Sequence, residues 1–317
     1  MTRGGVSRRT AIVTGAAGFL GSHLVDRLLE EGYSVVGLDN LCTGAISNLQ
    51  LAGRDPHFHF HLGDVREPLP VRADVIFNLA CPASPPRYQA DPHATLTTSV
   101  LGALRVLEAA QGTSSVIVHA STSEVYGDPV MHPQHESYWG NVNPVGVRAC
   151  YDEGKRCAET IFADARRGQR VDARIARIFN TYGPRMALDD GRVVSNLITQ
   201  ALLKRPLTIY GSGNQTRSFC YVSDLIDGLM LLARCSRYEE PVNLGNDFEF
   251  KIRELVLEVL ELVPGEFTFE PLPKDDPTRR RPDLSRAREL LGYEPKVQLR
   301  QGLQLTVADF RARVSSR

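Results

Sequence analysis

Short apolar segments alternate with longer segments of helical spacing along the first half of the chain. The short segments are rich in valine and isoleucine, and we expect them to be strands at 10–13, 34–38, 58–61, 75–79, 116–119 and 173–178. Leu20, Leu24 and Leu28 recur every four residues after the first of them, which predicts an amphipathic helix. Strands that alternate with helices predict a parallel sheet covered on both faces, because parallel connections need crossovers.

The pattern changes in the second half, where shorter elements rich in glycine and arginine follow one another. A helix expected at 252–262 and the basic run Arg279–Arg281 belong to this part. We therefore predict an α/β protein with a doubly wound, Rossmann-type parallel sheet in residues 1–182, to which residues of about 219–246 return. A smaller C-terminal cap, mainly 183–317, is expected to bind a substrate.

Composition argues against several classes of function. The 37 basic residues of the 317-residue chain balance 37 acidic residues, so the basic excess of a nucleic-acid-binding surface is absent. No apolar run approaches the roughly 20 residues that span a bilayer, and residues 1–9, an expected loose end, lack the apolar segment of a signal peptide. Six scattered cysteines without a Cys-x-x-Cys pair indicate reduced thiols. We expect a cytoplasmic protein with no nucleic-acid partner, no membrane partner and no metal.

Three glycines, Gly15, Gly18 and Gly21, stand where the first expected strand meets the first helix. Three glycines alone also fit a tight turn. Their position between a strand and a helix favours a site for the pyrophosphate of a dinucleotide, because glycine lets the backbone approach the phosphates and the helix N-terminus offers them free N–H groups. Asp39 ends the next strand, where a carboxylate accepts both ribose hydroxyls of NAD and repels the 2′-phosphate of NADP. No arginine follows it in the segment DNLCTG, so we predict NAD as the cofactor.

Tyr151 and Lys155 lie one helical turn apart in the segment CYDEGKR, on the same face of an expected helix. The pair alone fits an ordinary surface contact. With a dinucleotide site upstream, proton transfer becomes the better interpretation. A phenol with a pKa near 10 is a poor base, and a nearby ammonium and a positive nicotinamide both lower that pKa.

The glycine spacing followed by Tyr-x-x-x-Lys resembles the extended short-chain dehydrogenase/reductase superfamily over nearly the whole chain. The segments GDV (63–65), NLA (78–80) and STSEVYG (121–127) occupy further family positions. The resemblance implies a triad in which Tyr151 removes the proton of a substrate hydroxyl, Thr122 hydrogen-bonds that oxygen and Lys155 holds the nicotinamide ribose. Together with the glycine segment it implies cofactor contacts from Gly15, Gly18, Phe19, Leu20, Gly21, Asp39, Asn40, Thr43, Gly44, Asp64, Val65, Leu79, Cys81, Thr98, Ala120, Tyr151 and Lys155.

A narrower resemblance, to the UDP-glucuronate decarboxylases or UDP-xylose synthases, rests on Thr122-Ser123-Glu124 and on longer segments. Sugar-nucleotide 4,6-dehydratases usually carry Thr-Asp-Glu there, and simple 4-epimerases usually lack the glutamate. The segments CPASPPRYQADP, ARIFNTYGPRM, DGRVVSN, LTIYGSGNQTRSFCYVSDL and DDPTRRRPDLSRAREL follow in family order. The resemblance implies oxidation of UDP-glucuronate at C4, loss of carbon dioxide from the resulting beta-keto acid and re-reduction to UDP-xylose, with Glu124 near C5.

The same resemblance implies that the cap binds the UDP sugar. The candidate substrate residues are Asn180, Arg185, Arg192, Val194, Tyr210, Gln215, Arg217 and Arg281. Arg185 is also placed to pair with Asp189 or Asp190, and Tyr210 also fits a core position. His119, at the end of a strand, is expected to be packed rather than catalytic. A 4-epimerase, a 4,6-dehydratase and a non-catalytic NAD- or nucleotide-sugar-binding regulator remain alternatives, although a regulator has no need of the triad.

The chain departs from the family at Thr97 and Ser99, which replace a lysine and an asparagine, so a positive charge near the active-site helix is lost. The superfamily also implies a homodimer, in which the helix of Tyr151 and a helix at about 95–110 form a four-helix interface. The apolar residues of these helices that exceed what one sheet face obviously buries include Leu101, Leu104, Ile161 and Phe162.

Overall fold

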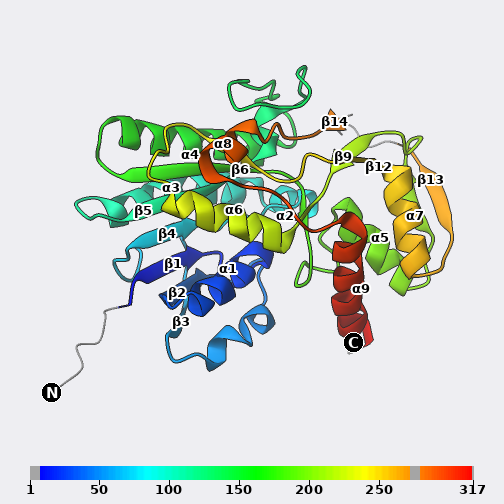
Figure 1. The fold of residues 1–317 in the computed structure, drawn as a ribbon, viewed down its shortest axis with the longest axis horizontal. Helices are drawn as coiled ribbons and strands as arrows, with labels where there is room; N and C mark the ends of the chain where they lie inside the picture. Colours follow the sequence, from blue (N-terminus) through cyan, green and yellow to red (C-terminus); the bar gives the residue numbers. More distant parts are fainter. Residues whose placement is uncertain (1–7, 272–278, 316–317) are drawn as a thin grey trace.

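A parallel sheet of seven strands forms the larger part of the computed structural model, which describes residues 8–271 and 279–315 (Figure 1). The strand order β11-β6-β5-β4-β1-β2-β3 reverses its direction at β1, as in a doubly wound sheet. The strands are β1 (Thr10–Thr14), β2 (Ser34–Asp39), β3 (Phe58–Leu62), β4 (Val75–Asn78), β5 (Val116–Thr122), β6 (Asp172–Ile178) and β11 (Val242–Leu244). The predicted fold class is confirmed, and the six predicted strands are present with ends within three residues of those expected.

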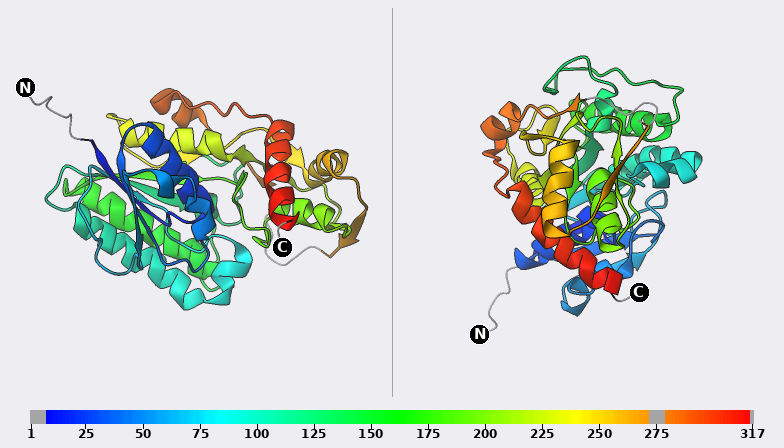
Figure 2. Two further views of the ribbon diagram at one scale, coloured as in Figure 1. Left: turned by 90° about the horizontal axis from the view of Figure 1, so that it is seen from below. Right: turned by 90° about the vertical axis from the view of Figure 1, so that its right-hand side faces the viewer.

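Helices cover both faces of this sheet, because successive strand residues point to opposite sides. Val13, Phe77 and Val118 belong to the core on the side of α1 (Phe19–Glu30) and α6 (Val222–Arg234). Ile12, Ile76 and Ile117 belong to the core on the side of α3 (Pro92–Ala110) and α4 (Ala149–Arg167). Figure 2 shows the sheet between these two helix layers. The continuously apolar strands of the sequence are therefore the ones buried on both faces.

A smaller group of elements packs beside the carboxyl end of the sheet (Figures 1 and 2). Its helices are α5 (Val193–Leu202), α7 (Ile252–Leu262) and α9 (Leu299–Ser315), and α7 has the bounds that the sequence predicts. Its strands form two small sheets: β8 (Leu207–Tyr210) with β13 (Phe267–Glu270), and β9 (Thr216–Ser218) between β12 (Glu249–Lys251) and β14 (Arg279–Arg280). The chain leaves the main sheet for this group and returns to it through α6 and β11.

The remaining elements are short. They are α2 (Pro85–Ala90), α8 (Ser285–Leu291), the 3-10 turns η1 (Ile46–Leu49), η2 (Ala52–Arg54) and η3 (Ser123–Tyr126), and the paired strands β7 (Thr181–Tyr182) and β10 (Cys220–Tyr221). Most of the expected loose end, residues 1–7, lies outside the described residues. Within the described residues, none of the helices combines the length and apolar character that crossing a membrane requires.

Candidate active site

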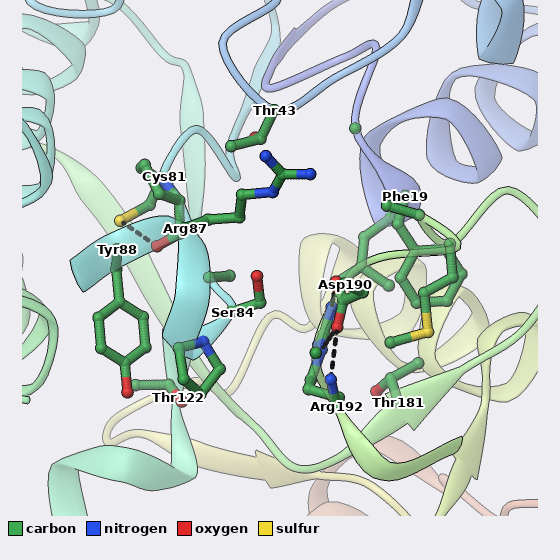
Figure 3. A pocket seen from close by; sticks show the side chains of 18 of the residues that line it. Phe19, Thr43, Cys81, Ser84, Arg87, Tyr88, Thr122, Thr181, Asp190 and Arg192 are labelled. Atoms are coloured by element: carbon green, nitrogen blue, oxygen red, sulfur yellow. Dashed lines mark hydrogen bonds and ion pairs between the residues drawn. The ribbon is translucent and has the colours of Figure 1, made fainter. Parts of the chain in front are cut away.

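A cavity of about 790 Å³ lies at the carboxyl ends of the central strands, between the main sheet and the smaller group (Figure 3). Carboxyl ends of parallel strands meet at one edge of a sheet, and ligands bind there where the strand order reverses. The cavity is lined by the predicted residues Gly15, Gly18, Phe19, Leu20, Gly21, Asp39, Asn40, Thr43, Asp64, Val65, Leu79, Cys81, Thr98, Ala120, Thr122, Glu124, Tyr151, Lys155, Asn180, Arg185, Arg192, Val194, Tyr210, Gln215 and Arg217.

Two predicted residues, Gly44 and Arg281, do not line this cavity. A side chain at Gly44 would lie 3.0 Å from Asp39 Oδ2, so this glycine leaves room for the carboxylate instead. Arg281 donates its backbone N–H to Gln134 at 2.9 Å, and its guanidinium lies 3.8 Å from Glu249. Its neighbour Arg280 lines the cavity in its place and is 3% exposed.

The turn after β1 has the shape that a dinucleotide needs. Gly15 has φ +71°, and an added Cβ would lie 3.0 Å from the backbone of Ala80. A Cβ at Gly21 would lie 2.0 Å from Gly15 O, so the turn excludes any side chain there. Gly18 is the N-cap of α1 and has no side chain that could accept a hydrogen bond from the helix. The first N–H groups of α1 therefore remain available for a phosphate. These residues fit the pyrophosphate of NAD.

Asp39 is fixed at the end of β2 by its neighbours. Its Oδ2 accepts the backbone N–H of Ala17 at 2.9 Å, and its Oδ1 accepts that of Leu41 at 2.7 Å. Burial raises the pKa of the carboxyl, while these N–H groups oppose that effect. The carboxylate is therefore held in a defined position at the cavity wall, where the predicted ribose hydroxyls would lie.

An Asp39→Asn variant, which keeps the side-chain shape, is expected to bind NAD more weakly and to narrow the preference for NAD over NADP. The amide no longer repels a 2′-phosphate, and it offers one acceptor fewer to the ribose. Isothermal titration calorimetry with both dinucleotides measures the two affinities. If the unsubstituted protein already binds NADP as tightly as NAD, the role given to Asp39 is wrong.

The three triad residues come from two elements that pack together. Thr122 ends β5, while Tyr151 and Lys155 lie one turn apart on α4. Lys155 Nζ donates to Ala120 O at 2.8 Å and lies 5.9 Å from the centre of the Tyr151 ring. The Tyr151 ring stacks on that of Tyr88, with ring centres 5.0 Å apart and planes 5° from parallel. The phenol is thus held between a second aromatic ring and the end of β5.

Burial dominates the protonation of this pair. It raises the pKa of Tyr151, although a hydrogen bond from Thr122 acts in the opposite direction. It lowers the pKa of Lys155, which the carboxylate of Glu159 partly offsets. Burial thus opposes formation of the phenolate, and the positive nicotinamide of NAD+ would favour that phenolate when the cofactor is bound.

Sequence reasoning missed three side chains that line the cavity beside the triad: Tyr88, Arg148 and Arg280. Glu124 forms ion pairs with both arginines. Burial raises the pKa of Tyr88 to about 12 and lowers that of Arg280 to about 10. The hydroxyl of Tyr88 and Nε of Arg280 are buried without a hydrogen-bond partner in the described part of the chain. The sequence does contain evidence for the place of Arg148, because this residue precedes Tyr151 by three positions and so lies on the same helix face.

Asp152, next to Tyr151, is a buried carboxyl whose Oδ1 has no hydrogen-bond partner among the described residues. Burial raises its pKa to about 7. A carboxyl with a raised pKa stabilises the fold while it is protonated, and its ionisation costs stability as the pH rises from about 4, the unfolded value, through about 7. Asp152→Asn is therefore expected to stabilise the protein by about 2 kcal/mol more at pH 8 than at pH 5. Urea unfolding at both pH values tests this, and an equal gain at both would contradict it.

The predicted substrate arginines differ in their partners. Arg192 Nε lies 2.5 Å from Asp190 Oδ1, and Figure 3 shows this pair at the cavity wall. Arg185 Nη2 pairs with Asp26 at 2.7 Å, and so with neither of the two aspartates expected as its alternative partners. Arg217 donates to Thr216 O at 2.9 Å and is buried.

The remaining candidate residues also have defined positions in the structure. Tyr210 is 41% exposed and lines the cavity, so it is not a core residue. The carbonyl oxygen of Tyr210 accepts a hydrogen bond from Gln215 Nε2 at 2.8 Å. Val194 is buried. Asn180 lines the cavity, and its carbonyl oxygen accepts the N–H of Cys220 at 2.9 Å. His119 is 1% exposed and packs on Phe162, as expected for a packed histidine.

The two departures from the family have local partners. Arg66 Nη1 lies 3.5 Å from Thr97 Oγ1, which places a guanidinium beside this threonine. Arg66 is held there by Asp64, at 2.8 Å. Ser99 Oγ lies 3.3 Å from Cys81 Sγ. Thr97 and Ser99 therefore each contact a neighbouring side chain, and the carboxylate of Asp64 balances the charge of Arg66.

Comparisons of this chain with a family model, with related sequences and with solved structures agree on one family. The model of the family "NAD dependent epimerase/dehydratase family" matches residues 11–245. UDP-glucuronic acid decarboxylases 4 and 2 of Arabidopsis thaliana are each 54% identical over 96% of this chain, covering 69% and 68% of their own lengths. The crystal structure of UDP-glucuronic acid 4-epimerase from Bacillus cereus with UDP-glucuronic acid and NAD has a TM-score of 0.86 at 28% identity, covering 96% of this chain and 99% of that one. The chain therefore belongs to the NAD dependent epimerase/dehydratase family, and within it is similar to the UDP-glucuronic acid decarboxylases.

Proposed function

We propose that this protein catalyses the NAD-dependent decarboxylation of UDP-glucuronate to UDP-xylose. The observation that carries the proposal is the juxtaposition of Tyr151, Thr122 and Lys155 with Arg148 and Arg280 in one cavity. The first three residues suit proton transfer at a sugar hydroxyl. The two arginines supply positive charge for a substrate carboxylate. The 54% identity to plant UDP-glucuronic acid decarboxylases supports the same reaction.

The first step takes place at C4 of the sugar. When bound, NAD+ accepts a hydride from C4 and returns it in the last step, so the reaction is redox-neutral. Tyr151 takes the proton of the 4-hydroxyl, and Thr122 hydrogen-bonds the same oxygen. Lys155, buried beside the phenol, favours the phenolate through its charge and holds the nicotinamide ribose.

The 4-ketone lies beta to the C6 carboxylate, so the C5–C6 bond breaks readily. Its electrons delocalise into the ketone as an enolate, carbon dioxide leaves and C5 takes a proton. Tyr151 and Thr122 stabilise the enolate oxygen with donors that are already in place. Arg148 and Arg280 orient the carboxylate beforehand, and Glu124 between them acts on the later steps, near C5.

The roles of the other residues follow from this assignment. The segments 1–182 and 219–246 hold the cofactor, and most of 183–317 holds UDP. Arg192 and Arg217 bind the diphosphate, with Asn180 beside them, while Val194 and Tyr210 flank the uracil. The free cysteines of the described chain fit a cytoplasmic protein, since that compartment keeps thiols reduced.

Incubation with UDP-glucuronate and NAD+, followed by mass spectrometry, tests the reaction. Loss of one carbon dioxide from the sugar nucleotide is the expected result. A product of unchanged mass with an altered sugar would indicate an epimerase. In a parallel incubation with UDP-glucose, loss of water would indicate a dehydratase. A regulator would leave both sugar nucleotides unchanged.

We also propose a homodimer built on α3 and α4. Leu101 and Leu104 of α3 are 43% and 39% exposed, and α3 packs along α4. Phe162, which the sequence also suggested for this face, is instead fully buried in the core of one chain. A second copy that adds its own two helices would bury these leucines. Light scattering at micromolar concentration is expected to give twice the 35.1 kDa mass of the chain. A mass of one chain would contradict the proposal.

A further inference from the structure

An ion pair joins the two segments that border the mouth of the cavity. Arg87 lies on α2, which follows the main sheet strand β4, and Asp189 lies in the loop before α5. Arg87 Nη2 is 2.6 Å from Asp189 Oδ2, with the side chains 42% and 72% exposed. Arg87 lines the cavity and Asp189 does not, so the pair stands at its solvent side. Figure 3 shows the Arg87 side chain extended over the cavity.

The two segments also pack against each other and carry residues of the site. Gly191 has φ +89°, and a Cβ there would lie 2.5 Å from Pro86 Cγ, so the loop is packed directly against α2. Next to Arg87 on α2 is Tyr88, whose ring stacks on Tyr151. Arg87, which pairs with Asp189 at the mouth, is therefore adjacent in the chain to Tyr88, which stacks on the catalytic candidate Tyr151.

We propose that the Arg87–Asp189 ion pair keeps this mouth closed between the loss of carbon dioxide and the re-reduction at C4. It thereby sets how much product leaves as UDP-4-keto-pentose instead of UDP-xylose. The inference rests on the proposed function. It makes Arg87 and Asp189 determinants of the product and leaves the chemistry to the triad.

The chemistry gives the closure its importance. After the C5–C6 bond has broken and C5 has taken a proton, the bound sugar is a stable 4-ketone. UDP-xylose forms only when C4 regains its hydride and the oxygen regains its proton from Tyr151. Carbon dioxide is small enough to leave a closed cavity, whereas a sugar nucleotide needs the mouth to open. Opening before re-reduction therefore releases the ketone.

The test uses Arg87→Ala, Asp189→Ala, the double alanine variant and the charge-exchanged pair Arg87→Asp with Asp189→Arg. The ratio of UDP-4-keto-pentose to UDP-xylose is measured by mass spectrometry, and the dissociation rate of UDP by stopped flow. Each alanine variant is expected to raise both by about two- to fivefold, the range for an exposed ion pair. The double variant is expected to equal the single ones, the exchanged pair to restore the parent values, and high salt to abolish the difference.

Arg300→Ala is the matched control. Arg300 of α9 pairs with Glu261 of α7 at 2.6 Å, with side chains 54% and 58% exposed, and neither residue lines the cavity. This variant is expected to leave the ratio and the UDP dissociation rate unchanged.

Three outcomes would overturn the inference. They are an unchanged product ratio in both alanine variants, an effect of Arg87→Ala without one of Asp189→Ala, and failure of the exchanged pair to restore the parent ratio. The second would mean that Arg87 contacts the ligand directly. If the unsubstituted protein released no carbon dioxide, the proposed function would fail instead, and the dissociation rates of UDP would still decide the role of the ion pair.

Discussion

Tyr151→Phe is expected to lower turnover by about 10²–10⁴-fold while the protein folds and binds NAD normally, because removal of a general base typically costs this much. The substitution removes only the hydroxyl. The ring keeps its stack on Tyr88, at 5.0 Å between centres, and the helix keeps its packing. The hydrogen bond with Thr122 and the support of the enolate oxygen are lost together.

The measurement is UDP-xylose formation at saturating UDP-glucuronate, alongside NAD affinity by calorimetry and thermal unfolding. Tyr33→Phe is a suitable control, because Tyr33 is buried but does not line the cavity. Near-parent turnover in a correctly folded Tyr151→Phe variant would end the proton-transfer assignment. A variant that also loses NAD binding would show that the hydroxyl holds the site together instead.

The fold was predictable because burial on both faces leaves a strong pattern in the sequence. Strands such as Val75–Asn78 are fully buried and consist almost wholly of apolar residues. The glycine turn was predictable for a different reason: the positive φ of Gly15 and the absence of space for a side chain at Gly21 demand glycine at fixed spacing. Both signals lie within a few neighbouring residues, where sequence reasoning is strongest.

The choice between Arg280 and Arg281 illustrates what such reasoning misses. Neighbouring residues of an extended segment point in opposite directions, and Arg281 directly follows the last residue of β14, so only one of the two adjacent arginines lines the cavity. Their chemistry is identical, and only the pairing of β14 with β9 decides between them. That pairing sets Arg280 opposite Arg217, and both line the cavity. No pattern in the basic run carries this information.

Partners that are distant in the sequence were missed for the same reason. Glu124 meets Arg148 across 24 residues and Arg280 across 156. Arg185 meets Asp26 across 159 residues, although two aspartates stand within five residues of it. Proximity in the sequence favoured those aspartates, but they pair with Arg87 and Arg192.

The second large effect is expected at Glu124, which pairs with the buried Arg280 and the partly buried Arg148. Glu124→Gln keeps the shape of the side chain but leaves Arg148 and Arg280 without their shared carboxylate. Removing one partner of a buried ion pair costs about 3–5 kcal/mol, because the remaining charge stays desolvated. We therefore expect a loss of stability of this order, larger than for a carboxylate at the surface. Urea unfolding measures it, with Glu240→Gln as the control, since the Glu240 side chain is 66% exposed and pairs with Arg286 at 2.7 Å.

The same substitution is expected to change the reaction after C4 oxidation. If Glu124 acts near C5, Glu124→Gln raises the share of UDP-4-keto species relative to UDP-xylose and does not merely slow both. The dissociation rate of UDP separates this effect from that of the Arg87–Asp189 pair, because a residue acting on the chemistry leaves that rate unchanged. A Glu124→Gln variant with parent stability and an unchanged product ratio would contradict both parts of the prediction. Glu124 would then be neither a required counter-charge for Arg148 and Arg280 nor a participant in the later steps.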